Sequence, residues 1–234
     1  MINKKLFAIA PMFFLALYFS ACSPADNGTS PLEDGMKITL PEPKYDSETS
    51  IEEAILNRRS IRDYTGQPLT LQDVSQLLWA AQGITDPSGF RAAPSAGATY
   101  PLEIYIVVGD VESVAGGIYR YKPQQHELVK IFDGEHREAL AGAALNQQFI
   151  TEAPLNIVIT AIYERTTNRY GERGIRYVYM EAGHAAQNVY LQAFALNLGT
   201  VVVGAFNDGR VANILALPGN EVPLYIMPVG RIAD

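Results

Sequence analysis

Three arginines surround one serine close to residue 60. Arg58, Arg59, Ser60 and Arg62 lie within "NRRSIRDYTG", residues 57–66, in a chain whose formal net charge is −7. Guanidinium groups donate forked, charge-assisted hydrogen bonds, and with a hydroxyl donor they suit a phosphate monoester. Cations at a helix C-terminus are also favourable, by a few tenths to about 1 kcal/mol, which accounts for one or two of these arginines. The cluster therefore indicates either a phosphate-binding site or, in part, the end of a helix.

A second candidate segment is "APSAGATYPLEIYIV", residues 93–107. Its small residues, including Gly97, let a backbone approach a flat ligand closely. Pro94 and Pro101 stiffen the segment, as a binding site requires, although a plain surface loop is the alternative. We expect this loop to be the second part of a site.

Several classes of chemistry lack support in the sequence. No G-x-G-x-x-G, G-x-x-x-x-G-K or G-x-S-x-G motif occurs, which leaves dinucleotide-binding loops, P-loops and the hydrolase elbow unsupported. The three histidines are widely separated and there is a single cysteine, so we expect no metal site and no cysteine nucleophile. The acidic balance argues against nucleic acid as a partner.

Capping and periodicity predict the elements that hold these residues. Ser50 with Glu53, and Thr70 with Asp73, have the spacing of capping boxes that begin helices. The longest helical stretch, residues 175–198, is apolar on most sides and is expected to end at Gly199 as a C-cap. Other helices are expected over residues 135–145 and from Asp208.

Runs rich in β-branched and aromatic residues predict the strands. They cover residues 102–109, 117–121, 127–132, 156–163, 200–206 and 223–230, with a hairpin between the second and third. Helices and strands interleave without regular alternation, which predicts an α+β fold with a mostly antiparallel or mixed central sheet surrounded by helices. We assign residues 50–234 to this single domain.

The N-terminal residues have the pattern of an export signal. Lys4 and Lys5 precede an apolar run, and small residues before Cys22 resemble a bacterial lipoprotein signal. We therefore expect a signal peptide over residues 1–21, lipidation of Cys22 and a flexible tether over residues 22–49. This predicts an extracytoplasmic protein anchored to a bacterial membrane; an uncleaved N-terminal anchor with an incidental cysteine is the alternative.

The segments "RRSIRDY", "LLWAAQGIT", "APSAGATYPLEIYIV", "YGERGIRYVYMEAGHAAQNVYLQAFALNLGT" and "VVVGAFND" together resemble the nitroreductase superfamily and, within it, the SagB-type dehydrogenase branch. The resemblance runs in order from about residue 40 to about residue 230. It implies an FMN-dependent oxidoreductase with NAD(P)H as a possible electron donor and a small-molecule redox substrate. It also implies a homodimer with two flavins at the subunit interface.

The resemblance carries roles to particular residues. Arg58, Arg59, Ser60 and Arg62 would hold the ribityl phosphate, with Arg231 nearby; Pro94, Ser95, Ala96 and Gly97 would line the flavin, often from the opposite subunit; Gly204 and Ala205 would face the reactive ring nitrogen. The helix over residues 175–198 would form the dimer seam.

Arg169 and Tyr170 are the catalytic candidates. They occupy the position of a Lys-Tyr pair that is thought to remove a proton in peptide-modifying members of the branch, which oxidise azoline rings. Arginine stays charged at working pH and cannot act as a base, which leaves Tyr170. An azoline-type peptide oxidase and a non-catalytic flavin-binding lipoprotein are therefore the alternatives. Further candidates beside the ring are Tyr100, Tyr119, Tyr121, Gln187 and Asn188.

Overall fold

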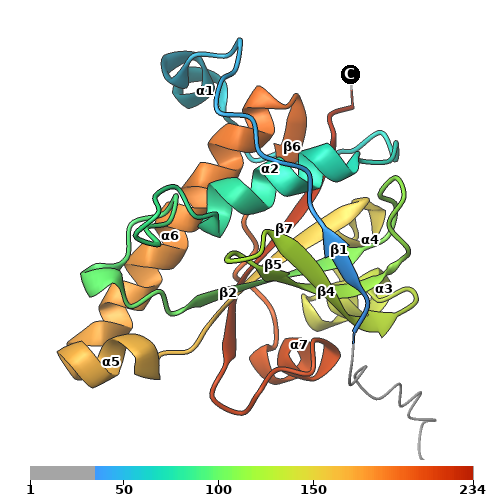
Figure 1. Ribbon diagram of the computed structural model, residues 1–234. Coiled ribbons are helices and arrows are strands. Elements are labelled where there is room, and N and C mark those ends of the chain that lie inside the picture. Colours follow the sequence, from blue (N-terminus) through green and yellow to red (C-terminus); the bar gives the residue numbers. More distant parts are fainter. Residues whose placement is uncertain (1–34, 234) are drawn as a thin grey trace, which may run out of the picture.

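The computed structural model describes residues 35–233, which form one body around a central sheet (Figure 1). The sheet has seven strands, all paired antiparallel, in the order β1-β4-β3-β2-β5-β7-β6. The strands are Lys37–Thr39 (β1), Leu102–Val108 (β2), Gly117–Lys122 (β3), Glu127–Asp133 (β4), Leu155–Ala161 (β5), Leu198–Thr200 (β6) and Val222–Arg231 (β7). The predicted signal peptide, Cys22 and the first part of the predicted tether lie outside the described residues.

Helices cover both faces of this sheet (Figure 1). They are Ile51–Asn57 (α1), Leu71–Gln82 (α2), Arg137–Ala143 (α3), Phe149–Glu152 (α4), Glu164–Tyr170 (α5), Arg173–Ala195 (α6) and Asp208–Ile214 (α7). On β2, Ile104 and Ile106 pack in the cluster that includes α2 and α6, whereas Tyr105 and Val107 pack in the cluster that includes α3, α4 and α7. Successive side chains of a strand point to opposite faces of the sheet, which explains this alternation. The sheet is therefore buried on both faces and separates two apolar cores.

The helix starts predicted at Ser50 and Thr70 are confirmed, although the reciprocal capping-box bond forms only at Thr70. The Ser50 side chain accepts a hydrogen bond from the Glu53 amide and begins α1. At α2 the capping box is complete, because the Thr70 side chain accepts from the Asp73 amide and the Asp73 side chain accepts from the Thr70 amide. Two of the backbone donors left over at that helix start are thereby satisfied.

The region after the long helix differs from its prediction. α6 ends at Ala195, and Gly199 is not its C-cap but the middle residue of β6. Asn197, with a φ of 56°, makes the left-handed turn between the two elements. A Cβ atom at position 199 would lie 2.6 Å from a side-chain carbon of Ile61. Glycine is therefore required here for close packing. From the sequence alone, a glycine needed for packing looks the same as a glycine that caps a helix.

Two more predictions need correction. The strand expected over residues 200–206 is regular only to Thr200, after which Val203 alone bridges to Ile226. The helix expected over residues 135–145 spans only Arg137–Ala143. The short helix α5 was not predicted, since its sequence "ERTTNRY" has no apolar periodicity.

The described part of the predicted tether packs against the domain. β1 pairs with β4, and Leu40 is buried in the core. Farther on, the Lys44 amide donates to the Gln76 side chain on α2, which donates back to the Lys44 carbonyl. Residues 37–44 therefore belong to the fold. Among the described helices, none has the length and apolar character needed to cross a membrane.

Candidate functional site

The first part of the site lies where the chain leaves α1. The guanidinium carbon of Arg58 lies 5.0 Å from the ring centroid of Tyr190 on α6. The hydroxyls of Ser60 and Tyr190 are 3.1 Å apart, and the Tyr190 oxygen accepts the Val202 amide at 2.8 Å. Because Val202 already donates to that oxygen, the Tyr190 hydrogen is available to Ser60. The exposed Ser60 hydroxyl can both donate and accept, so it retains bonding capacity for a ligand.

Residues 147–149 contact both Arg62 and the backbone at Ala205. The Ile61 amide donates to the Thr200 carbonyl at 2.9 Å, which fixes the segment against β6. The guanidinium carbon of Arg62 lies 5.6 Å from the ring centroid of Phe149. Two residues before Phe149, the Gln147 side chain donates to the Ala205 carbonyl at 3.2 Å.

Gly204 and Ala205 are exposed, and a cleft of about 470 Å³ opens beside Gly204. A Cβ atom at position 204 would meet only a ring carbon of Tyr225, at 4.0 Å. The structure therefore leaves one face of this backbone free for a flat group.

The three clustered arginines differ in what they contact. Arg59 turns back to α1, and its Nη1 donates to the carbonyls of Leu56 and Arg58 at 3.0 and 2.8 Å. This is the helix-end role that the sequence left open. Arg58 and Arg62 lie on aromatic rings instead, and within residues 35–233 neither pairs with a carboxylate. Together with Ser60 they present positive charge and free donors.

Arg231 is held beside this segment by two contacts. Its carbonyl accepts the Thr65 amide at 3.0 Å, and its Nη2 lies 2.8 Å from Oδ2 of Asp73, which also caps α2. Asp73 therefore binds one side of the guanidinium group. A planar guanidinium has five N–H donors, so others remain for a ligand.

The second part of the site contains the predicted loop and the predicted catalytic pair. Gly97 has a φ of 60°, in the left-handed region, and Nη1 of Arg169 donates to its carbonyl at 3.0 Å. A Cβ atom at position 97 would lie 2.5 Å from the Tyr170 hydroxyl and 2.9 Å from the Arg169 guanidinium. The structure thus brings Arg169 and Tyr170 onto the loop of Pro94, Ser95, Ala96 and Gly97. Pro94 and Gly97 are exposed.

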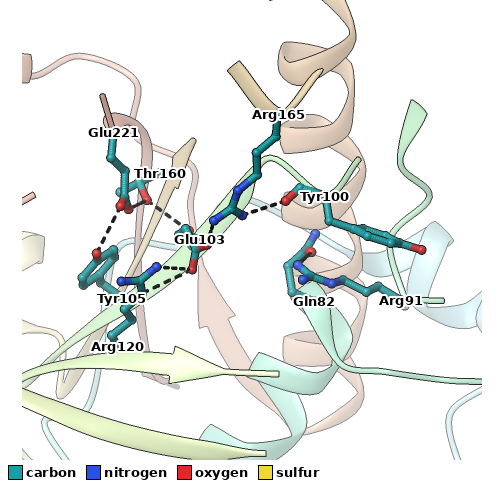
Figure 2. Close-up of polar contacts among 9 residues, drawn as sticks. All are labelled: Gln82, Arg91, Tyr100, Glu103, Tyr105, Arg120, Thr160, Arg165 and Glu221. Carbon is teal, nitrogen blue, oxygen red and sulfur yellow. Dashed lines mark hydrogen bonds and ion pairs between the residues drawn. The ribbon is translucent and has the colours of Figure 1, made fainter. Parts of the chain in front are cut away.

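An ionic network fixes α5, which carries this pair, to the sheet (Figure 2). Arg165 binds Oε1 of Glu103 at 2.6 Å and the Tyr100 carbonyl at 2.9 Å, while Arg120 binds the other carboxyl oxygen of Glu103 at 2.9 Å. Burial alone would raise the pKa of Glu103, but the two guanidinium groups lower it below its ordinary value. Glu103 is therefore ionised and connects β2, β3 and α5.

The two parts of the site contact different sides of α6. The first contacts Tyr190 through Arg58 and Ser60, whereas in the second Ser95 lies against Glu181. Nine residues separate these two positions of α6, and at about 3.6 residues per turn they face opposite sides of the helix. The two parts of one chain therefore cannot enclose the same small ligand.

The other aromatic and amide candidates have mostly structural contacts. Tyr119 and Tyr121 are buried in the core, and their hydroxyls bond the Ala115 carbonyl and His126. The Arg91 guanidinium carbon lies 4.5 Å from the centroid of the Tyr100 ring (Figure 2). Asn188 donates to the carbonyls of Ala80 and Ala92, so it joins α6 to the loop after α2. Gln187 is exposed on α6.

Four residues of the site were missed in the sequence: Gln147, Phe149, Glu181 and Tyr190. None belongs to a motif of its own. Each becomes relevant only because the fold brings it against a segment more than 50 residues away in the sequence.

Comparisons with known proteins agree with this arrangement. Residues 55–231 match the nitroreductase family. A nitroreductase-like protein of Methanocaldococcus jannaschii is 53% identical over 198 residues, which cover 85% of this chain and 98% of that protein. The crystal structure of a nitroreductase-like protein from Ralstonia eutropha superimposes with a TM-score of 0.75 at 31% identity, covering 88% of this chain and 94% of that one.

More distant relatives are named for specific activities. The microcin B17-processing protein McbC of Escherichia coli is 27% identical over 71% of this chain, and the match spans only 64% of McbC. The NADPH-dependent FMN reductase of Bacillus subtilis is 24% identical over 78% of this chain and 66% of its own length.

Proposed function

The chain belongs to the nitroreductase family of FMN-dependent oxidoreductases, and from this premise we propose that two copies of it bind FMN between them. The observation that carries the proposal is the set of free donors on Arg58, Ser60 and Arg62, next to the exposed backbone of Gly204. Their charge and geometry fit the phosphate of FMN. The exposed glycine and the cleft beside it fit a flat ring.

The second copy supplies what one chain cannot. The loop of Pro94, Ser95, Ala96 and Gly97 lies on the opposite side of α6 from Tyr190, so in one protomer it cannot cover a ring held by Arg58 and Arg62. A second copy packed symmetrically against α6 would place its own loop there. Each of the two sites would then combine the phosphate donors of one subunit with the loop of the other.

The protein's contribution to the reaction is binding and positioning. Bound FMN supplies hydride and electron transfer between a nicotinamide donor and a small acceptor. Arg58, Ser60 and Arg62 bind its phosphate, with Arg231 oriented toward them by Asp73. The backbone at Gly204 and Ala205 faces the ring, and in each subunit Arg169 fixes its own loop through the Gly97 carbonyl.

A second candidate function is oxidation of an azoline ring in a peptide. It is favoured by the position of Tyr170, whose hydroxyl lies directly against Gly97 of the proposed ring-covering loop, and by the relationship to McbC. Arg169 is hydrogen-bonded to Gly97 and permanently charged, so Tyr170 would be the proton-accepting group. A Tyr170→Phe variant that reduces FMN with NAD(P)H normally but loses peptide oxidation would support this alternative. The third alternative, a non-catalytic flavin-binding lipoprotein, predicts bound FMN without turnover by any donor.

We also propose that the chain is exported and lipid-anchored through Cys22. The proposal depends on the sequence of residues 1–22 alone. Expression of the full chain in a bacterial host should place it in the membrane fraction with an acylated N-terminus. Cys22→Ser should release it from that fraction; a variant that is still acylated would refute the proposal.

The flavin content of the purified protein tests the main proposal. The full chain should be yellow and release FMN on denaturation, and the Arg58→Ala/Arg62→Ala double variant should be colourless but folded. Arg59→Ala is the control: it removes one guanidinium group of the same cluster, from a side chain bound to α1, and it should retain FMN. A double variant that keeps its flavin would overturn the assignment of the phosphate site.

A further inference from the structure

Glu181 is a buried carboxyl group that the proposed function does not use. It lies on the side of α6 that packs against the Arg91–Ser95 segment, and only 2% of the residue is exposed. Within the described residues, neither of its carboxyl oxygens has a hydrogen-bond partner. Burying an ionised carboxylate without donors is costly, so such a group is retained neutral or becomes ionised only when the structure changes.

The nearest positive charge is engaged elsewhere. Arg91 is the one charged group that acts appreciably on Glu181 in the described part of the chain. Its Nη1 donates to the Gln82 side chain at 2.7 Å, and its guanidinium carbon lies 4.5 Å from the Tyr100 ring centroid (Figure 2). Arg91 forms no ion pair with a carboxylate of residues 35–233. A buried acid and a half-buried cation are thus adjacent without being paired.

Ser95 connects Glu181 to the proposed flavin-covering loop. Its hydroxyl oxygen accepts the Tyr100 amide at 2.9 Å, so its hydrogen is free to turn toward Glu181. This hydroxyl and the Arg91 guanidinium both act to lower the pKa of Glu181. A change in the charge of Glu181 therefore acts on Arg91 and Ser95, which belong to the same segment as Pro94 and Gly97.

We propose that Glu181 is a positioning residue that binds one proton and, through Arg91 and Ser95, couples this proton to the affinity of the Pro94–Gly97 loop for FMN. The coupling rests on the proposed function; the proton-dependent rearrangement of the loop does not. With Glu181 neutral, Arg91 stays on Gln82 and Tyr100, and the loop keeps the conformation described above. With Glu181 ionised, the carboxylate attracts the Arg91 guanidinium and the Ser95 hydrogen, which shifts the loop and disfavours an anionic ligand.

The surrounding charges make this transition accessible near neutral pH. Burial raises the pKa of Glu181 to about 7, although Ser95 and Arg91 act to lower it. Burial also lowers the pKa of Arg91, partly offset by Glu103 on β2 and reinforced by Arg165 on α5. Arg91 remains charged, so Glu181 is the group that titrates.

The first measurement needs no flavin. Trp79, the only tryptophan of the chain, lines the same cleft as Arg91, between α1, α2 and α6. In the full chain without added FMN, we expect its emission to change with a midpoint near pH 7. Glu181→Gln, which mimics the neutral acid, should abolish this transition, whereas Glu138→Gln, which removes an exposed carboxylate on α3, should retain it. A transition that persists in Glu181→Gln, or that is absent from the native protein, overturns the proposal.

The second measurement is the affinity for FMN as a function of pH. The dissociation constant of the native protein should rise by up to about tenfold per pH unit above the midpoint. Glu181→Gln should stay near the native low-pH value, and Glu138→Gln controls for the titration of FMN itself. Equal pH dependence in all three proteins refutes the coupling. A protein that shows the Trp79 transition but binds no FMN at any pH refutes the proposed function and the coupling. Only the proton-dependent rearrangement of the loop would then stand.

Discussion

At the scale of single residues, the arginine cluster shows how neighbouring side chains of one type divide between structure and ligand binding. Arg59 satisfies carbonyls at the end of α1, whereas Arg58 and Arg62 lie on aromatic rings that position them without neutralising them. A ring supports a guanidinium group through its π face, but its quadrupole compensates only part of the charge. The remaining field is what draws an anion to this segment.

Gly97 offers a test of the contact between the loop and the catalytic candidates. Gly97→Ala must place a Cβ atom in the left-handed region, which costs about 1–2 kcal/mol, and also against Tyr170 and Arg169. We expect a lower free energy of unfolding and weaker FMN binding, measured by urea titration and flavin fluorescence. Gly89→Ala is the control, because Gly89 has a φ of 87° and open space around it. Equal losses of stability in the two variants would mean that the contact with Tyr170 contributes nothing.

Glu181 also makes stability depend on pH, with a sign that follows from its raised pKa. Because the folded state holds this proton more tightly than the unfolded state, the associated stability is complete below the ordinary value of 4.5 and is lost as pH rises to about 7. The loss has an upper limit of about 3 kcal/mol. Measured by urea unfolding against Glu181→Gln over this range, the native protein should lose stability relative to the variant. Parallel curves for the two proteins would contradict this assignment.

At the scale of elements, Asp73 serves α2 and the phosphate segment together. It completes the capping box with Thr70 and binds Arg231 at the end of β7. Thr70→Ala should therefore cost about 1 kcal/mol of stability with little effect on FMN affinity, because Arg231 keeps its partner. Asp73→Ala should cost more stability and also weaken FMN binding, since Arg231 loses its orientation.

Urea unfolding and FMN titration of both variants separate the two roles. Thr70→Ser, which retains the hydroxyl, is the control for the cap and should behave like the native protein. If Thr70→Ala and Asp73→Ala weaken FMN binding equally, the contact between Asp73 and Arg231 does not position the phosphate site.

The elements that were predicted correctly carry local signals. Hydroxyl and acidic residues at N-caps marked α1 and α2, and the apolar runs marked β2 and β5, because capping and burial on both faces leave direct traces in the sequence. The end of α6 was misplaced because Gly199 is fixed by packing against Ile61, a contact that no local pattern shows. The arginines, the loop and Gly204 could be picked out in the sequence. Their separation by α6 could not, because it depends on how the helix is rotated within the fold.

At the scale of the whole molecule, α1 and α6 each expose several large apolar side chains. Exposed large apolar side chains lie on α1 and in the first turns of α6: Ile51, Ile55, Leu56, Ile175, Tyr179 and Met180. Large apolar side chains that stay exposed in one chain are candidates for burial at an interaction site. The two helices also adjoin both parts of the proposed flavin site, so covering them with a second copy would complete the site and bury these side chains in one step.

The oligomeric state therefore yields a joint prediction. Met180 is 52% exposed and Ile55 61% exposed in one chain. Because both side chains are exposed there, Met180→Glu and Ile55→Asp should leave folding of the protomer unaffected. Each would place a charge in the interface of a dimer that buries these residues, and should disrupt it. Sedimentation should show the native protein as a dimer with two FMN, and both variants as monomers that have lost FMN although Arg58, Ser60 and Arg62 are intact. Met36→Asp, which charges an exposed apolar residue next to β1, is the control and should stay dimeric and yellow. A monomeric variant that binds FMN with native affinity would show that one chain holds the whole site, against the opposite placement of Glu181 and Tyr190 around α6.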